Sequence, residues 1–255
     1  MHLKINKLFS ILFFFSALYA ESKTVAYRVE FGIVGEVAKI QSQYTKTKNT
    51  YTIDTKVKVI GMLAKMATNN LREEHISKGT IDKSGLHVTN DFTMLKHYGN
   101  YRSITHYHVD HQKKKIIKTY KKWRVYDNKK ERKVSEYSYI LGYYAKDDLI
   151  TLFLNLNKHI PNKMLARKYI FKAIGEDRKQ GRVDIDIPKA KEKKEMIKLL
   201  GKPKKNEWLA NVIMHRKLYN SKKGELMVRM NGESLIEKAV LKDIFMYGDV
   251  RIIRE

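Results

Sequence analysis

The sequence predicts a mainly β protein, in which a curved, half-barrel-like antiparallel sheet packs around one apolar helix and a short second helix lies on the surface. Two observations lead to this fold class. Short segments of alternating polar and apolar residues follow one another, separated by turn residues. The regular alternation of strands and helices that is typical of a parallel sheet is missing from the sequence. Because no linker interrupts the pattern, we expect a single domain over residues 21–255.

The strands are predicted from period-two patterns. In AYRVEFGIVGEVAKI the apolar side starts at Tyr27, and Gly32 and Gly35 indicate a bend or bulge. TYTIDTKVKVI places its aromatic and aliphatic residues on one side and its charged residues on the other. Further strands are expected in LHVTNDFTMLK, RSITHYHV, KIIKTYKKWRVY, RKYIFKAI, GRVDIDI, EWLANVIMHRKLY, ELMVRM, SLIEKAVLKDIF and DVRIIRE. The last four are predicted to form hairpins with turns at residues 220–224, 231–232 and 248.

One helix is predicted between Asp148 and Ile160. Either Asp147 or Asp148 provides a helix cap, and a single apolar stripe follows. That stripe consists of Leu149, Leu152, Phe153, Leu156 and Ile160. Its residues either face a ligand or belong to the core. Core burial is the prediction, and on that basis Phe153→Ala is expected to cost about 3 to 5 kcal/mol of stability.

Two weaker helices are also expected. KAKEKKEMIKLLG follows Pro188 and stops at Gly201, and its many charges favour a place on the surface. GMLAKM breaks the strand alternation, because Met62, Leu63 and Met66 follow helical spacing.

The N-terminus has the three parts of a secretory signal peptide. Lysines at the start are followed by an apolar run over residues 8–18 and by the small residue Ala20. The run is shorter than the roughly 20 residues that a membrane-spanning helix needs, so cleavage after Ala20 is expected. We therefore predict an exported, periplasmic protein of residues 21–255. The chain contains no cysteine, which excludes disulfides and a lipid-modified cysteine.

The formal net charge of +25 indicates an acidic partner. Nucleic acid is not expected, because an exported protein first meets anionic lipid head groups and other envelope polymers. A simple solvated surface also explains lysines that are spread over every segment.

The stretch THYHVDHQ contains His106, His108, Asp110 and His111 in the H-x-H-x-D-H spacing of metallo-β-lactamase-like hydrolases. A hairpin explains the same residues without a metal, because a strand over residues 102–109 places His106 and His108 on one face and residues 110–114 in the turn. Lysines follow the motif, and they would repel a divalent cation. The hairpin is favoured, and these four residues remain weak candidates for metal ligands.

Other chemistry is not indicated. The sequence has no nucleophile elbow, no Gly-rich phosphate loop and no H-E-x-x-H motif, so we expect no cofactor and no enzymatic activity. Aromatic residues alternate with lysines in KTYKKWRVY and cluster in YSYILGYY. Such residues can stack on bases or sugars and pair with phosphates, although half-buried strands contain the same residue types.

The order of several segments resembles a bacterial exported family catalogued as domain of unknown function 3108. These segments are YRVEFGIVGEV, GMLAKM, REEHISKGTIDKSGLHVTNDF, DDLITLFLNL and ELMVRMNGESLIEKAVLKDIFMYGDVRI. The resemblance implies a Gram-negative envelope protein with an antiparallel half-barrel around a helix, and it brings no catalytic residues.

The expected function is therefore a non-enzymatic envelope protein that holds an apolar or amphipathic molecule, such as a lipid, on a curved sheet. A metal-dependent hydrolase and a binder of an anionic polymer are the alternatives.

Overall fold

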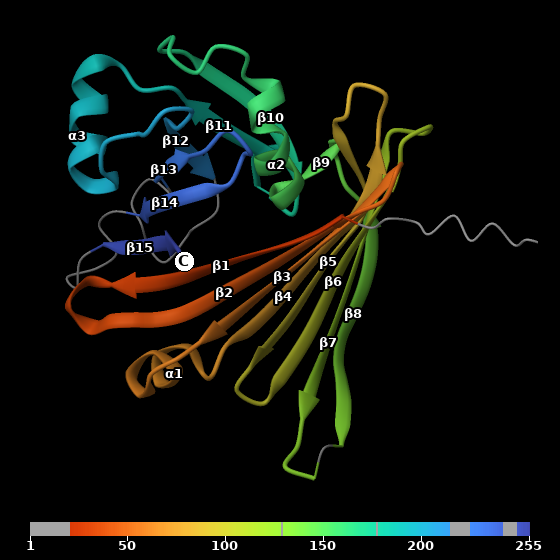
Figure 1. Cartoon of the computed structure of the whole chain (residues 1–255). Helices are drawn as coiled ribbons and strands as arrows, with labels where there is room; N and C mark the ends of the chain where they lie inside the picture. Colours follow the sequence, from red (N-terminus) through yellow and green to blue (C-terminus); the bar gives the residue numbers. More distant parts are fainter. Residues whose placement is uncertain (1–20, 129, 177, 215–224, 242–248) are drawn as a thin grey trace, which may run out of the picture.

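The structure is a computed structural model that describes residues 21–128, 130–176, 178–214, 225–241 and 249–255 (Figure 1). The predicted signal peptide and the turns expected at residues 220–224 and at Gly248 lie outside the described residues.

The described strands form one large, open, mainly antiparallel sheet that is not closed into a barrel. Its strand order is β8-β7-β6-β5-β4-β3-β2-β1-β15-β14-β13-β12-β11-β10-β9. The prediction of a mainly β protein with an antiparallel sheet is confirmed.

The N-terminal half of the sheet is a meander in which each strand pairs with the next strand in the chain. Its strands are β1 (Glu21–Phe31), β2 (Gly35–Lys46), β3 (Thr50–Val59), β4 (Arg72–Ile81), β5 (His87–Tyr98), β6 (Tyr101–Asp110), β7 (Lys115–Val125) and β8 (Glu131–Ile140). Gly32 begins a short 3-10 turn over residues 32–34 and Gly35 begins β2, so the two glycines lie in the connection between two strands and do not bend a single strand.

The C-terminal half returns toward the start of the chain. Its strands are β9 (Asp147–Asp148), β10 (Lys168–Ile174), β11 (Arg182–Asp186), β12 (Trp208–Met214), β13 (Glu225–Met230), β14 (Ile236–Leu241) and β15 (Val250–Arg254). β15 pairs with β1, so that Tyr27 lies opposite Arg254 and joins the two halves. β9 and β10 pair in parallel, because the helix α2 (Leu149–His159) connects them.

The helices are α1 (Met62–Thr68), α2 (Leu149–His159) and α3 (Ala190–Leu200). None of the helices in the described ranges is long and apolar enough to span a bilayer. The prediction that α3 lies on the surface was only half right. Met196 and Leu200 are buried against Leu209 and Val240 of the sheet, while the lysine-rich side faces outward.

The main core lies between α2 and the C-terminal half of the sheet. Leu152, Leu156 and Ile160 are completely buried there. They contact a continuous apolar surface made of Val183, Ile185, Trp208, Ala210, Val212, Val228 and Met230. The core position predicted for the helix is correct for these residues, whereas Leu149 and Phe153 are only partly buried at its margin. Phe153 was predicted to be buried in the core, and it packs against the core but is only partly buried.

Candidate functional site

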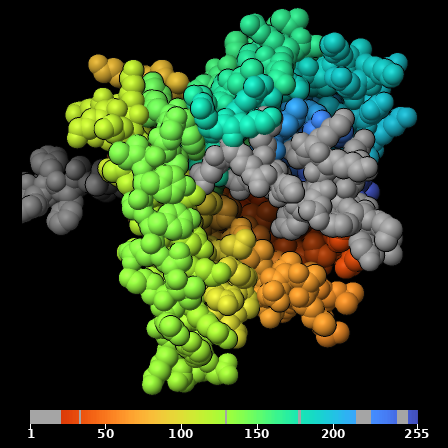
Figure 2. All heavy atoms as spheres, turned by 180° about the vertical axis from the view of Figure 1, so that it is seen from behind, coloured from red at the N-terminus to blue at the C-terminus, as the bar shows by residue number. Residues whose placement is uncertain are grey.

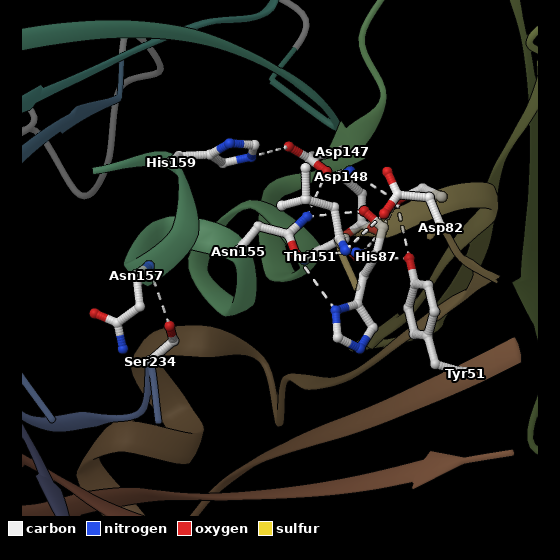
Figure 3. Close-up of polar contacts among 12 residues, drawn as sticks. Tyr51, Asp82, His87, Asp147, Asp148, Thr151, Asn155, Asn157, His159 and Ser234 are labelled. Atoms are coloured by element: carbon white, nitrogen blue, oxygen red, sulfur yellow. Dashed lines mark hydrogen bonds and ion pairs between the residues drawn. The ribbon is translucent and has the colours of Figure 1, made fainter. Parts of the chain in front are cut away.

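Polar side chains connect the other side of α2 to the N-terminal half of the sheet (Figure 3). Asp148 is fully buried, and its Oδ1 accepts hydrogen bonds from the backbone N–H groups of Ile150 at 2.8 Å and Thr151 at 3.1 Å. Its Oδ2 accepts hydrogen bonds from the hydroxyls of Ser77, Thr89 and Thr151, at 2.9 Å for both threonines. Asp148 is thus the helix cap and also a link to β4 and β5.

Tyr51 on β3 completes this group, which we call the Asp148 cluster: Tyr51, Ser77, Thr89, Asp148 and Thr151. The Tyr51 hydroxyl lies 2.9 Å from the Thr151 hydroxyl and 3.3 Å from that of Thr89. Burial raises the pKa of Tyr51 to about 12, so the phenol remains protonated. Burial also raises the pKa of the Asp148 carboxyl, while the hydroxyl groups around it act in the opposite direction.

A second chain of hydrogen bonds runs beside the Asp148 cluster. Asn155 donates to Asp147 at 2.9 Å and to the backbone carbonyl of His87 at 2.8 Å. His159 lies 3.1 Å from Asp147, and Tyr44 lies 2.8 Å from His87. Asp147 therefore binds side chains of α2 and is not the cap.

These contacts hold α2 on two sides. Its apolar stripe lies in the core with the C-terminal strands, and its polar side is bonded to β3–β5. Such an anchored helix fills the inner side of the sheet where the two halves meet, and it is not built as a mobile lid. A ligand surface must therefore be sought farther along the N-terminal strands.

The inner face of β5–β8 carries a group of aromatic and cationic side chains. Phe92 packs against Gly175 beside β10, which identifies the inner side of β5. Directly opposed residues of antiparallel strands point to the same face, so the register continues this side from Phe92 through Tyr107 and Lys118 to Tyr139. We call the resulting set of side chains the tyrosine–lysine face: Tyr98, Tyr101, Tyr107, Lys118, Tyr120, Lys122, Tyr137 and Tyr139, of which Tyr107 and Lys118 are buried.

Stacked rings form most of this face. Tyr120 and Tyr137 stack with a centroid distance of 4.9 Å, and Tyr137 stacks on Tyr139 at 5.9 Å. Tyr98 and Tyr101 form another stacked pair at 5.7 Å. Tyr137 and Tyr139 are exposed, so the face offers flat rings to a ligand.

Lysines lie over these rings. The ammonium group of Lys122 lies 4.1 Å from the ring centroid of Tyr101, a short cation–π distance. A hydrogen bond with Tyr98 raises the pKa of Lys122, so this side chain stays charged. Lys118 lies 5.5 Å from the ring of Tyr107 and 5.8 Å from that of Tyr139. The face therefore combines apolar area with fixed positive charge.

A depression of about 360 Å³ lies at one end of the tyrosine–lysine face. It is lined by Asn69, Tyr98, Gly99, Asn100, Tyr101 and Arg124. Amide, phenol and guanidinium groups in one depression can bind an acidic group together.

Glu73, on the inner side of β4, is a carboxylate whose ion pairs can be tested by mutation. Glu73 lies 2.9 Å from Lys96 and 3.1 Å from His75. Burial opposes the ionisation of Glu73, but the hydrogen bonds and charges of His75 and Lys96 outweigh it and lower the pKa of Glu73 to about 2.

We expect Glu73→Gln to reduce the free energy of unfolding at pH 7 by up to about 3 kcal/mol, since one pKa unit corresponds to about 1.4 kcal/mol. The folded-state pKa is depressed, so the stabilisation is complete above the ordinary carboxyl pKa and disappears as the pH falls toward about 2. Urea unfolding across this pH range measures the difference. The control is Glu74→Gln, because Glu74 is half-buried and pairs with the exposed Lys56 at 3.4 Å, and this change should have little effect. If the loss of unfolding free energy in Glu73→Gln did not depend on pH, the stabilisation would not come from the ionised Glu73 carboxylate.

The histidine motif lies on a strand and its turn, and the structure separates its members. His106 and His108 point to the outer face of β6, opposite to the tyrosine–lysine face, as the hairpin model predicted. The two rings lie 3.4 Å and 2.9 Å from Asp91, and His106 also lies 2.9 Å from Thr93.

The other two members of the motif have different roles. Asp110 accepts a hydrogen bond from the backbone of Lys113 at 2.9 Å and closes the β6–β7 turn. His111 contacts the hydroxyl of Tyr144 at 2.8 Å and the carbonyl of Thr89 at 2.9 Å. Within the described ranges, no three His, Asp or Glu side chains are placed to share a metal ion. The geometry gives the hydrolase interpretation no support.

The sequence indicated part of the tyrosine–lysine face. KTYKKWRVY and YSYILGYY contain residues of this face, but the same segments also contain Trp123 and Ile140, which lie on the outer side. Tyr98 and Tyr101 were missed, because only the β5–β6 register brings them beside Lys122.

Comparisons with known proteins add a structural likeness to these observations. No protein-family model matches the chain, and no curated protein matches it. The structure is similar to the crystal structure of a beta-barrel-like protein of domain of unknown function DUF1849 from Brucella abortus, with a TM-score of 0.44 and 8% sequence identity. The match covers 91% of this chain and 94% of that chain. Similarity at this level says nothing about function, and the resemblance to domain of unknown function 3108 stays a prediction.

Proposed function

We propose that this protein is a non-enzymatic, exported binding protein whose tyrosine–lysine face holds an amphipathic envelope molecule with an acidic group. The observation that carries the proposal is the joint presence of stacked, exposed tyrosines and ring-bound lysines on one face. Tyrosine rings offer apolar area at a low cost in side-chain entropy, and ammonium groups attract a phosphate or carboxylate. The export to the periplasm follows from the N-terminal sequence pattern alone.

The position of α2 limits where this ligand lies. Because α2 fills the inner side over β3–β5, an acyl chain cannot enter the main core without displacing buried leucines. A ligand lying flat on β5–β8 requires no such change. The acidic group then lies near Arg124, which lines the depression at the end of the face, and near Lys122, which lies over the ring of Tyr101.

The test is a binding titration with lysophosphatidylglycerol below its micellar concentration. We expect saturable binding that the double variant Tyr120→Ser/Tyr137→Ser weakens about 10-fold or more, since it removes a stacked pair of rings. Thr119→Ala is the matched control, because Thr119 lies on the same strand and points to the outer face.

Two results would contradict the proposal. One is unchanged affinity in the tyrosine variant, and the other is no binding by the wild-type protein. Lysophosphatidylcholine, which has no net charge, should bind more weakly than lysophosphatidylglycerol. If the protein bound lysophosphatidylcholine more tightly, the lysines would have no role in attracting the ligand. A binder of anionic polymers would instead lose nearly all affinity at high salt.

A further inference from the structure

Helix α1 presents its apolar side to the outside. Successive residues of an α-helix are about 100° apart, so Met62, Met66, Leu63 and Ala67 cover an arc of about 140°. Met62, Leu63 and Met66 are 76%, 66% and 70% exposed, and no residue of α1 is buried. An amphipathic helix normally turns this arc toward the core. Here the apolar side is free to contact something outside the described chain.

The position of α1 makes this apolar group accessible. The helix lies in the connection between β3 and β4, at the end of the fan formed by the N-terminal strands (Figure 1). In Figure 2 its orange spheres protrude at the lower margin of the molecule. Ile60 donates a hydrogen bond to the carbonyl of Val37 at 2.8 Å, so α1 begins beside the β1–β2 connection, where Val34 is also exposed.

Positive charges surround this tip. Lys65 lies on α1 itself, and Lys58 lies opposite both Lys39 and Arg72 on the neighbouring strands. In the part of the chain that the structure describes, Lys58, Lys65 and Arg72 have no acidic partner within ion-pair distance. Apolar side chains bordered by free cations match the surface of an anionic bilayer, where acyl chains lie below negative head groups.

We propose that α1 docks this protein on an anionic lipid surface, with Met62, Leu63 and Met66 inserted at the head-group level and Lys58, Lys65 and Arg72 facing the lipid phosphates. A second copy of the chain fits this tip less well, because it would bring two +25 chains together. The docking uses the exposed apolar side chains of α1, whereas the tyrosine–lysine face lies on β5–β8; Asn69, the C-cap of α1, also lines the depression at the end of that face, and the triple variant leaves Asn69 unchanged.

The experiment uses the chain from Glu21, where the described structure begins, so that the apolar run at residues 8–18 does not contribute. Sedimentation with vesicles of phosphatidylglycerol and phosphatidylcholine measures partitioning. We expect Met62→Ser/Leu63→Ser/Met66→Ser to reduce partitioning at least 10-fold, and Lys58→Ala or Lys65→Ala to reduce it several-fold on the anionic vesicles only. The matched control is Met164→Ser/Leu165→Ser, whose side chains are 76% and 55% exposed in another loop. It should partition like the wild type.

The absence of cysteine allows a direct readout of depth. An environment-sensitive dye at Met62→Cys should shift to the blue on vesicles, while the same dye at Met164→Cys should not. Unchanged partitioning of the triple serine variant would overturn the proposal. The proposal would also be overturned if the dye shifted to the blue in the absence of vesicles and the shift grew with protein concentration, because this would show self-association of the protein. Lysophosphatidylglycerol binding by the triple variant should be normal, which separates this result from a failure of the tyrosine–lysine face.

Discussion

Replacing Asp148 with alanine is expected to lower the free energy of unfolding by about 3 to 5 kcal/mol. The change removes the helix cap, which contributes about 1 kcal/mol, and it leaves the buried hydroxyls of Ser77, Thr89 and Thr151 without their common acceptor. Each buried group that loses its partner costs roughly 1 to 3 kcal/mol, although the hydroxyls can rotate toward one another and recover part of this loss. Denaturant unfolding followed by circular dichroism measures the effect.

Asp148→Asn is the informative comparison. Its amide oxygen still caps the backbone of α2, and its amino group donates to hydroxyls that can then act as acceptors. We expect this variant to lose markedly less stability than Asp148→Ala. Equal losses would mean that side-chain volume, and not the hydrogen bonds, accounts for the role of Asp148.

The second large effect is expected for Leu156→Ala, which should cost about 2 to 5 kcal/mol. Leu156 is completely buried between α2 and the C-terminal strands, and alanine leaves a cavity there. Phe153→Ala should cost less than its ring size suggests, because Phe153 lies at the margin of the core and keeps part of its surface in water. Thermal and urea unfolding of both variants measure which of them loses more stability.

The reverse order of these two variants would contradict the packing of α2 described here. A loss of lysophosphatidylglycerol binding in Phe153→Ala without any loss of stability would point to a ligand beside the helix instead of on β5–β8.

The strands and helices could largely be predicted from local patterns, because alternation and helical spacing are properties of neighbouring residues. β8 was missed, since ERKVSEYSYI is an edge strand that is exposed nearly throughout and shows little alternation. The sequence indicated the capping role of Asp148, because an aspartate directly precedes the apolar stripe of the helix. Its hydroxyl partners were not visible, because Ser77 and Thr89 lie far from it in the sequence.

The orientation of the helices was the harder problem. The spacing of Met62, Leu63 and Met66 predicted a helix, and α1 is one, but spacing does not say whether the apolar side meets a core. The tyrosine–lysine face was hidden for a related reason. It depends on which strands are neighbours and in which register, and neither is encoded locally.

The pairing of β1 with β15 also determines the order in which the sheet can be completed. Strands β1–β8 need only their neighbours in the chain, so this meander can form before the C-terminal half of the sheet is in place. β1, the first of the described strands, keeps an unpaired edge until residues 250–254 pair with it. A nascent or truncated chain therefore exposes the backbone of Tyr27–Phe31, and protection of β1 from aggregation depends on the arrival of the last strand.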